Sequence, residues 1–516
     1  MKHIKKLASL LLALVMVFAL ATTAFAEETT YSITINNSTA GHTYEAYQIF
    51  TGDLATNEAG NKVLSNIVWG SGVSEAGQTA LGDAAAKAET LKTEDDAKAF
   101  AKAVAPYLTT AAGSANTVTD GKYVISGLAA GYYLVKDQDG SLIGDNDSYT
   151  EYIIQVVGNV TATPKSDVPE VQKKVKDIND STDTTKTDWQ DSADYDIGDS
   201  VPFQLKATLA DNVSSYTTYK VVFHDTLSKG LTYNKDAKVY IDGTETNGFT
   251  VTATVNADGT TTLTVSCDDV KALGAGNSSV ITVEYTAKLN ENAVLGSAGN
   301  PNEVYLEYSN NPNKSEEGNN ETGETPKDVV IVFTYKTIIN KVDSETKPLT
   351  GAAFKLEKLI KGEDGAADAW TTIKEFAVDG TTTSFTFSGL DDGQYKLTET
   401  KTPVGYNTID PIYFVIEATH GETADVPTLK TLNAYLTDAN GNKQTEMKDG
   451  ESVNIDLGTV DLTAGSITTT VVNKSGSELP STGGIGTTIF YVLGGVLVLA
   501  AVVLLVTKKR MSGAEK

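Results

Sequence analysis

The sequence predicts a mainly β protein, with three β-sandwich domains in tandem and a helical insertion in the first. Short runs that alternate apolar and polar residues recur along the chain, separated by turn pairs such as Asp242-Gly243. Long helical patterns are scarce. The exported part defined below, residues 27–482, has 456 residues, which is too long for one compact core and suggests about three domains. We therefore expect a rod of sandwiches.

The N-terminal 26 residues are typical of a signal peptide. Lys2, Lys5 and Lys6 precede an apolar stretch over residues 7–21, and Ala24-Phe25-Ala26 supplies the small residues of a signal-peptidase site. Residues 1–26 are therefore expected to be removed on export.

The first domain is expected over residues 27–166. Its strand patterns are interrupted by one helical region. Residues 75–108 are expected to be helical because they are rich in Ala, Leu, Lys and Glu and carry apolar residues at helical spacing. The expected strands are Tyr31–Ile35, Tyr44–Phe50, Lys122–Ser126, Gly131–Val135 and Tyr152–Val157.

The second domain, residues 167–327, reads as strands separated by turns. Alternation over Val171–Val175 places Lys173 on the apolar face and Lys174 on the opposite one. The polar tract Ser309–Lys327 reads as a linker or exposed loop. Cys267 is the only cysteine, so no intrachain disulfide can form, and its alternating surroundings make it a core strand residue.

The third domain is expected over residues 328–476 and repeats part of the first. Ser126–Asp137 aligns with Ser388–Glu399, with Ser, Gly, Leu, Gly and Tyr in register. The shared Gly131 and Gly393 suit a turn conformation that other residues resist.

Residues 477–516 combine a pentapeptide, an apolar run and a basic tail. Ile485–Val506 is 22 uncharged residues, and about 20 suffice to span a bilayer. The basic residues 508–510 follow at once and would stay in the cytoplasm, so the preceding chain lies outside. This order resembles the cell-wall sorting signal of Gram-positive surface proteins. The resemblance implies cleavage by a sortase between Thr482 and Gly483, with Thr482 passed to an amine. The motif residues are Leu479, Pro480, Ser481, Thr482 and Gly483.

The third domain carries two further motifs. Tyr395–Tyr406 resembles the E-box of Gram-positive pilins, and Ile339–Asp343 followed by Pro348–Phe354 resembles the opening of a Cna-B domain. Such domains form an internal Lys–Asn isopeptide bond. The resemblance assigns the lysine, acid and asparagine to Lys341, Glu399 and Asn473.

The chemistry explains these residue types. An apolar core lowers the pKa of a buried lysine and raises that of a buried carboxyl group, so both can be neutral. The amine can then attack the asparagine amide while the acid polarises the carbonyl oxygen and shuttles protons. Because the reaction occurs once per domain, it is autocatalytic maturation and not enzymatic turnover.

The second domain offers a parallel set. Phe223–Leu231 and Asn302–Pro312, together with the lysine-bearing strand, resemble the isopeptide-forming domain of fimbrial shaft proteins. The resemblance implies Lys173 as nucleophile, Asp225 as acid and Asn302 as acceptor. Lys174 and Asn300 remain rivals.

The first domain departs from the pattern. In the register of the repeat Asp137 fills the acid position, but Asn37 stands where the third domain has Lys341. We expect this domain to be uncrosslinked and therefore the least rigid of the three.

Two amines are candidates to receive Thr482: the peptidoglycan bridge, or a lysine of an identical subunit. Val160–Lys165 resembles the end of the pilin motif, whose lysine is the polymerising nucleophile, although Thr163 replaces its usual tyrosine and no tryptophan precedes it. Pro164 would keep the backbone extended and Lys165 accessible. We therefore predict Lys165 as the acceptor.

Charge and composition narrow the function further. Each removed end carries three net positive charges, so the exported part moves from a formal net charge of −26 to −32. Nucleic acid and anionic membranes both require clustered basic residues and are not expected partners. Four histidines and one cysteine exclude a zinc cluster of familiar spacing, and acidic turns such as Asp391-Asp392 lack calcium-loop spacing, so no metal or cofactor is expected.

Together these features predict a non-enzymatic shaft subunit of a sortase-assembled pilus at the cell surface, with its precursor held in the plasma membrane by residues 485–506. Expected partners are sortase, identical subunits, minor pilins, peptidoglycan and host surface ligands. The alternatives are a monomeric wall-anchored adhesin and a tip or base pilin.

Overall fold

The computed structural model describes residues 29–144, 146–164, 167–316, 318–448 and 451–476, with the isolated residues 498, 502 and 503. The predicted signal peptide, Lys165, the sorting motif and nearly all of the predicted span lie outside the described residues. Within the described part, no helix is long and apolar enough to cross a membrane.

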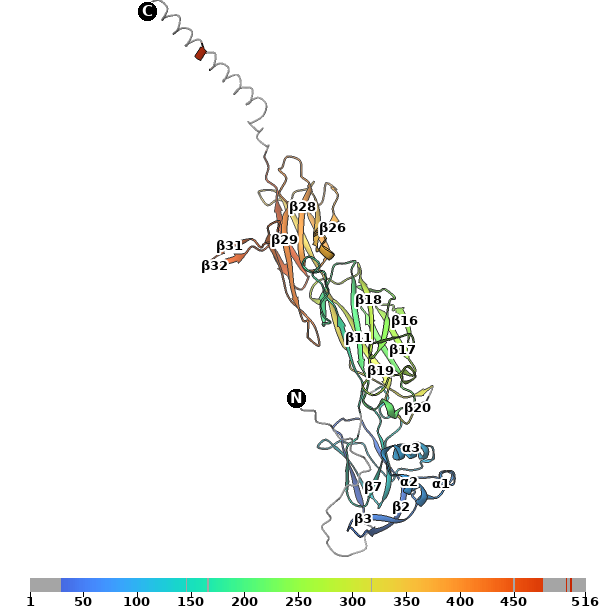
Figure 1. Cartoon of the computed structure of the whole chain (residues 1–516). Helices are drawn as coiled ribbons and strands as arrows, with labels where there is room; N and C mark the ends of the chain where they lie inside the picture. The colour runs from blue at the N-terminus through green and yellow to red at the C-terminus, as the bar shows by residue number, and fades with distance from the viewer. Residues whose placement is uncertain are drawn as a thin grey trace, which may run out of the picture.

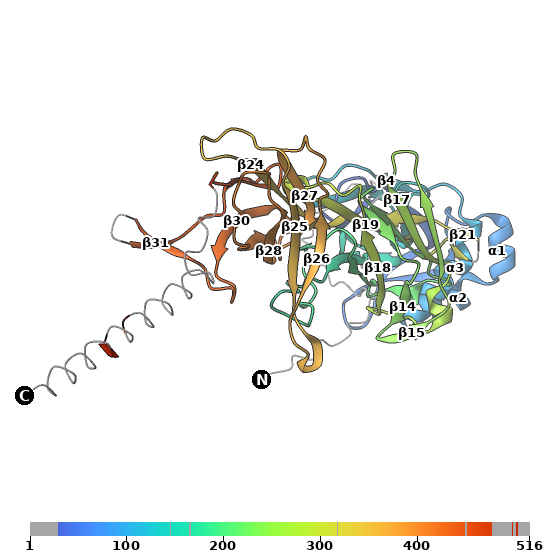
Figure 2. The ribbon, with the colours of Figure 1, turned by 90° about the horizontal axis from the view of Figure 1, so that it is seen from above.

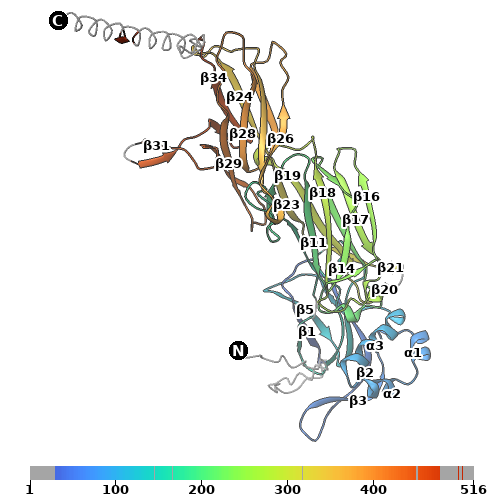
Figure 3. The ribbon, with the colours of Figure 1, turned by 45° about the horizontal axis from the view of Figure 1, so that its top comes forward.

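Three β-sandwich domains follow one another along an elongated molecule, as Figure 1 shows. The first carries the helices at one end, and the third carries a hairpin that projects from its side (Figure 3). Seen along another direction, the helices and the hairpin remain at opposite ends (Figure 2). This arrangement agrees with the predicted fold class.

The first domain has two sheets around a shared core. Its strands are β1 (Tyr31–Asn36), β2 (Tyr44–Thr56), β3 (Lys62–Trp69), β4 (Gly113–Ala115), β5 (Lys122–Leu128), β6 (Gly131–Asp137), β7 (Glu151–Val156) and β8 (Val160–Ala162). One sheet has the order β5-β1-β8, and the other β3-β2-β6-β7 with β4 beside β2.

The helical insertion consists of three short helices where the sequence predicted one region. They are α1 (Glu75–Leu81), α2 (Ala84–Thr90) and α3 (Glu94–Val104), followed by the 3₁₀ turn η1 (Ala105–Tyr107). Gly82 ends α1, and Asp83 caps α2 by accepting from the N–H of Ala86. Thr93 and Asp96 form a capping box at the start of α3. Local capping therefore divides a continuous helical pattern.

The second domain packs a seven-stranded sheet against a six-stranded one. The first has the order β10-β23-β19-β12-β17-β16 with β22 beside β19, and the second β15-β14-β18-β11-β9 with β13 beside β18. The strands are β9 (Glu170–Val175), β10 (Ser192–Asp194), β11 (Ser200–Thr208), β12 (Val221–Leu227), β13 (Leu231–Tyr233), β14 (Lys238–Ile241), β15 (Thr244–Thr246), β16 (Thr250–Val255), β17 (Thr261–Cys267), β18 (Val280–Leu289), β19 (Asn300–Ser309), β22 (Thr322–Glu324) and β23 (Asp328–Phe333). Three 3₁₀ turns are η2 (Val213–Ser215), η3 (Val270–Leu273) and η4 (Gly296–Ala298). Cys267 is buried and free.

The third domain has sheets of order β27-β24-β34-β33 and β26-β25-β28-β29-β30. Its elements are β24 (Tyr335–Val342), β25 (Ala353–Ile360), η5 (Glu363–Gly365), β26 (Ala369–Glu375), β27 (Ser384–Leu390), β28 (Gly393–Lys401), β29 (Ile412–His420), β30 (Leu429–Thr437), β31 (Thr445–Lys448), β32 (Glu451–Asn454), β33 (Thr459–Asp461) and β34 (Ser466–Val472). β31 and β32 form the projecting hairpin. The entering strand β24 and the leaving strand β34 pair in parallel, with Lys341 opposite Val471.

The tract Ser309–Lys327 is not the exposed linker that its composition suggested. It contains β20 (Ser315–Glu316), β21 (Asn319–Asn320) and β22. Asn310 is fully buried against the first domain, where its Nδ2 donates to the carbonyl of Leu142 at 2.8 Å and its own carbonyl accepts from the N–H of Tyr149 at 2.8 Å. Asparagine side chains can satisfy loop backbone groups, so a polar tract can form a buried joint.

The second and third domains are also joined by direct contacts. β23 lies beyond residue 327, where the sequence placed the boundary, but pairs with β10 and β19 of the second domain. The N–H of Ile197 donates to the carbonyl of Gly389 at 3.0 Å, and that of Lys361 to the carbonyl of Asp180 at 2.7 Å. The segment between β9 and β11 therefore contacts the third domain.

The internal repeat meets the glycine expectation at Gly393, whose φ is +145°, but not at Gly131. Gly127 and Gly389, equivalent in the repeat, both have φ of +78° at the strand end. Gly131 does not have positive φ, and a Cβ there would lie 2.7 Å from the carbonyl oxygen of Phe50. Close approach, and not turn conformation, therefore requires Gly131.

Candidate functional site

The second domain contains a fully buried Lys–Asp–Asn group. Lys173 stands on β9 of one sheet, whereas Asp225 on β12 and Asn302 on β19 belong to the other. The Nζ of Lys173 forms an ion pair with Oδ1 of Asp225. The lysine side chain therefore crosses the core between the two sheets.

Tyr285 on β18 joins the three side chains, and the sequence did not single it out. Its hydroxyl donates to Oδ2 of Asp225 at 2.5 Å, lies 3.2 Å from the Nζ of Lys173, and accepts from Nδ2 of Asn302 at 2.7 Å. Its ring stacks on Phe203. Tyr285 thus holds the asparagine amide beside the lysine.

Burial controls the electrostatics of this group. Loss of hydration lowers the pKa of Lys173, against the opposing effect of the Asp225 charge. The same burial raises the pKa of Asp225, against the effect of Lys173. A proton shared between amine and carboxyl can therefore move to the carboxyl at modest cost, which leaves a neutral amine. Oδ1 of Asn302 is buried and makes no hydrogen bond, so it is open to a protonated acid.

The two rivals lie elsewhere. Lys174 is partly exposed and pairs with Asp191 on the other side of the strand. The amide of Asn300 is satisfied by backbone groups, since its Oδ1 accepts from the N–H of Val294 at 2.8 Å and its Nδ2 donates to the carbonyl of Val332 at 3.0 Å. The geometry around Asp225 therefore favours Lys173 and Asn302.

The third domain buries Lys341 on β24 and Asn473 just beyond β34 of one sheet, together with Glu399 on β28 of the other sheet. Nδ2 of Asn473, just beyond β34, donates to Oε2 of Glu399 on β28 at 3.0 Å. Oδ1 of Asn473 and Oε1 of Glu399 are buried without hydrogen bonds. The acid and the amide thus meet directly.

Lys341 lies on β24, next to the strand that ends at Asn473. Its Nζ donates to the carbonyls of Val471 at 2.9 Å and Val342 at 3.2 Å. No ion pair joins it to Glu399 in the described part of the chain. Burial lowers the pKa of Lys341, while the charge of Glu399 opposes this change. The lysine is therefore close to the acid but not paired with it.

The first domain has a different group at the equivalent place. Nδ2 of Asn37 donates to the hydroxyl of Tyr44 at 2.8 Å. Asp137 is buried and bonds to Nδ1 of His42 at 2.7 Å, while Nε2 of the same ring bonds to Asp147 at 2.8 Å. Asn37 therefore stands at the lysine position, and the equivalent acid, Asp137, is paired with a histidine.

Lys165 and Leu479, Pro480, Ser481, Thr482 and Gly483 lie outside the described residues, but the flanks of Lys165 can be placed. Thr163 and Asp167 both line a cleft of about 590 Å³ between the first and second domains. Lys98 and Lys102 on α3 and Asn212 line it as well. The chain leaves and re-enters the described structure at this cleft.

The structure also gives the surroundings of His224, Asp391 and Asp392. His224 is partly exposed, stacks on Tyr305 and lies 2.9 Å from Glu307, as expected of a strand residue. Asp391 is buried and Asp392 partly so at the second joint, so neither is a solvated turn residue.

Comparison with protein families finds three matches along the chain. Residues 197–312 match the Gram-positive pilin backbone subunit 2, Cna-B-like domain, and residues 336–431 match the prealbumin-like fold domain SpaA. Residues 471–512 match the LPXTG cell wall anchor motif.

Individual proteins resemble the chain over most of its length. The trypsin-resistant surface T6 protein of Streptococcus pyogenes serotype M6 is 27% identical over 455 residues, covering 76% of this chain and 77% of that protein. The solved structure of the T6 backbone pilin of serotype M6 Streptococcus pyogenes, described as a modular three-domain structure, aligns with a TM-score of 0.53 at 19% identity, over 88% of this chain and all of that one. The major pilin SpaD of Corynebacterium diphtheriae aligns with a TM-score of 0.49 at 18% identity, over 88% and 99%.

Proposed function

Because the chain is an LPXTG-anchored backbone pilin of the Gram-positive type, and so a structural pilus subunit of the cell surface, we propose that Thr482 of one subunit is joined to Lys165 of the next and that two internal isopeptide bonds stabilise each subunit. The anchor motif makes it a sortase substrate linked to peptidoglycan. We extend the proposal to minor pilins and host surface ligands as partners of the assembled shaft.

The observation that carries the internal bonds is the burial of Lys173 against Asp225 and Asn302. After the proton moves to Asp225, Nζ of Lys173 attacks Cγ of Asn302, a C–N bond forms, the bond to Nδ2 breaks, and ammonia leaves. Tyr285 orients the amide. Glu399 would act in the same way between Lys341 and Asn473, to which it is already hydrogen-bonded.

Intact mass tests both bonds. We expect the exported chain to weigh less than its sequence by the mass of two ammonia molecules, because each bond releases one. Lys173→Met and Lys341→Met should each restore one ammonia. Lys174→Met is the matched control and should keep both losses. An exported chain at full sequence mass contradicts the proposal for both domains.

The proposed polymer joint is supported by the cleft between the first and second domains. Thr163 and Asp167, which flank Lys165 in the sequence, line it, and it is open between two domains. An extended peptide fits such a site better than a bulky domain. In this proposal the residues between Asn473 and Thr482, which precede the cleavage site in the sequence, supply that peptide.

Denaturing gels of cell-wall extracts distinguish a polymer from a monomeric adhesin. We expect a ladder of covalent multimers, which Lys165→Ala collapses to wall-anchored monomer because the acceptor amine is lost. Lys122→Ala, an exposed lysine of the same domain, should leave the ladder intact. A ladder that persists in Lys165→Ala shows that another lysine is the acceptor, and monomer alone in the parent favours the adhesin.

A further inference from the structure

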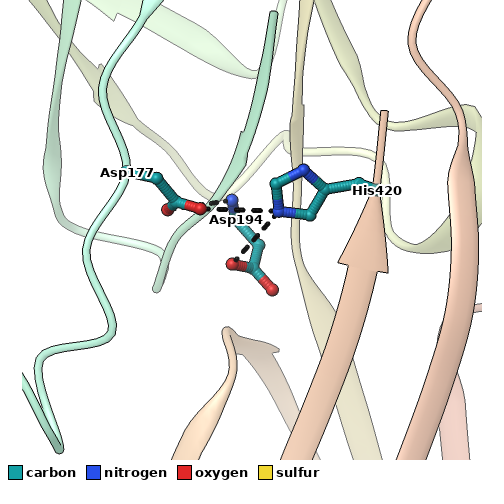
Figure 4. A group of neighbouring side chains, drawn as sticks. All are labelled: Asp177, Asp194 and His420. Carbon is teal, nitrogen blue, oxygen red and sulfur yellow. Dashed lines mark hydrogen bonds and ion pairs between the residues drawn. The ribbon is translucent and has the colours of Figure 1, made fainter. Parts of the chain in front are cut away.

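A second group of polar side chains lies at the joint between the second and third domains. Asp177 follows β9, Asp194 ends β10, and His420 ends β29 of the third domain. Figure 4 shows the two carboxylates and the imidazole converging on one point. One potential ligand atom from each residue lies within 4.8 Å of the other two. Asp177 lies four residues after Lys173, but the group shares no residue with either lysine–asparagine set.

The spacing of these atoms suits a shared metal ion. Nε2 of His420 lies 3.4 Å from Oδ2 of Asp177 and 3.9 Å from Oδ1 of Asp194. Two ligands bound at about 2.0–2.1 Å with tetrahedral angles lie roughly 3.4 Å apart. The arrangement therefore needs small side-chain adjustments to bind an ion.

The imidazole is oriented for coordination by a partner on its other nitrogen. Nδ1 of His420 lies 2.7 Å from the hydroxyl of Ser192, which is fully buried. When Nδ1–H donates to this hydroxyl, the lone pair of Nε2 points toward the carboxylates. Metal-binding histidines in proteins use their second nitrogen in this way.

The positive charge of Lys358 acts on this group only from a distance, because Lys358 pairs with Asp180, Asp196 and Asp391. Asp177, Asp194 and the nearby Asp392 form no ion pair with any lysine among the described residues. Oδ2 of Asp194 is buried and makes no hydrogen bond. Burial and the charges of Asp392 and Asp177 raise the pKa of Asp194 well above its usual value. Buried carboxylates without a counter-charge are costly, and a bound cation would remove that cost.

A neighbouring acidic group provides an internal comparison. Asp180, Asp196 and Asp391 also converge, but Nζ of Lys358 lies among them, 2.5 Å from Asp180 and 2.8 Å from Asp196. Lys358 pairs with Asp391 as well. One joint thus holds two carboxylate clusters, of which only the first lacks a lysine.

We propose that Asp177, Asp194 and His420 bind a divalent transition-metal ion, of the Zn²⁺ or Mn²⁺ class, that bridges the second and third domains. An imidazole with carboxylates favours these ions, whereas Ca²⁺ and Mg²⁺ prefer oxygen ligands alone. Water completes the coordination. The proposal revises the expectation that the chain binds no metal, because the ligands come from three separated segments and leave no spacing motif.

Bridging gives the ion a mechanical role. Asp177 and Asp194 belong to the second domain and His420 to the third, so the bound ion would add bonds across the joint. These act beside the hydrogen bond from the N–H of Asp191 to the carbonyl of Glu422 at 2.8 Å. The joint would therefore resist bending more when metal is bound.

Calorimetric titration with ZnCl₂ and with MnCl₂ tests the site. The full chain, purified in detergent and stripped of metal, is expected to bind one ion per chain. His420→Ala and Asp194→Asn should each weaken binding about tenfold or more, because each removes a ligand. His224→Ala removes a histidine outside the group and should bind as the parent does. The absence of binding by the parent, or retained affinity in either ligand variant, overturns the proposal.

Thermal unfolding of the same variants excludes a folding defect as the cause. Asp194→Asn keeps the side-chain shape and removes one of the repelling charges, so the metal-free variant should unfold at or above the temperature of the metal-free parent. Zn²⁺ should raise the unfolding temperature of the parent and of His224→Ala, but not that of His420→Ala or Asp194→Asn. A metal-free Asp194→Asn variant that unfolds at a lower temperature than the parent would mean that Asp194 serves as an ion-pair partner of His420, against the proposal.

Discussion

Asp225→Ala is expected to prevent the crosslink in the second domain and to destabilise that domain by several kcal/mol. The substitution leaves Lys173 buried without its carboxylate, which typically costs about 3–5 kcal/mol. It also removes the proposed acid, so the chain should gain the mass of one ammonia molecule. A covalent link that closes a loop on the order of 100 residues adds roughly 4–5 kcal/mol in a disulfide, and its loss adds to the effect.

Differential scanning calorimetry and intact mass measure the two effects together. The double variant Lys173→Met/Asp225→Asn separates them, because it removes the buried charges and the crosslink at once. It should regain the stability that Asp225→Ala loses through the unpaired lysine charge. Its second domain should still unfold at a lower temperature than that of the crosslinked parent. If Asp225→Ala still weighs two ammonia molecules less than its own sequence and keeps the parent unfolding temperature, the second-domain triad is wrong.

Period-two alternation was sufficient to predict several features of the second domain. Val171 and Val175 flank Lys173 on one face, so the lysine had to point into the core and Lys174 away from it. These features are local, and local patterns persist when a strand enters a sandwich.

Features that depend on distant segments could not be predicted in the same way. Tyr285 lies in an alternating strand where a tyrosine is ordinary, and only the fold brings its hydroxyl to Asp225. His420 and Asp177 meet because two domains pack together. Asn310 is polar and lies in a polar tract, yet it is buried, with backbone carbonyls of the first domain accepting from its amide nitrogen. Composition alone therefore suggested exposure.

The first domain lacks a lysine at its equivalent site, and its buried ion pairs make its stability sensitive to pH. Burial alone would lower the pKa of His42, but hydrogen bonds to Asp137 and Asp147 outweigh that effect and raise it to about 9. The pKa of the neighbouring Tyr44 is raised mainly by burial, and so is that of Tyr123, so neither ionises below pH 9. His42 is thus the group that titrates between neutral and alkaline pH in this cluster.

The sign follows from linkage. A histidine whose pKa is higher in the folded state than the ordinary 6.5 stabilises the fold fully below pH 6.5 and loses this contribution as pH rises to about 9. A rise from 6.5 to 9 corresponds to about 3 kcal/mol. We therefore expect the unfolding temperature of the first domain to fall as the pH rises from 6.5 to about 9.

Hydrogen exchange of the full chain at pH 6.5 and pH 9, corrected for intrinsic rates, measures this change domain by domain. Protection in β1, β2 and β6 should decrease at the higher pH, while the second and third domains, which we propose are crosslinked, change little. His42→Gln removes the titrating group, so its first domain should be less stable at pH 6.5 and nearly independent of pH. A parent first domain as stable at pH 9 as at pH 6.5 would contradict the role of His42. In the other domains the buried lysine can be consumed by a covalent bond, whereas here the charge on His42 persists, so the stability of the first domain depends on the surrounding pH.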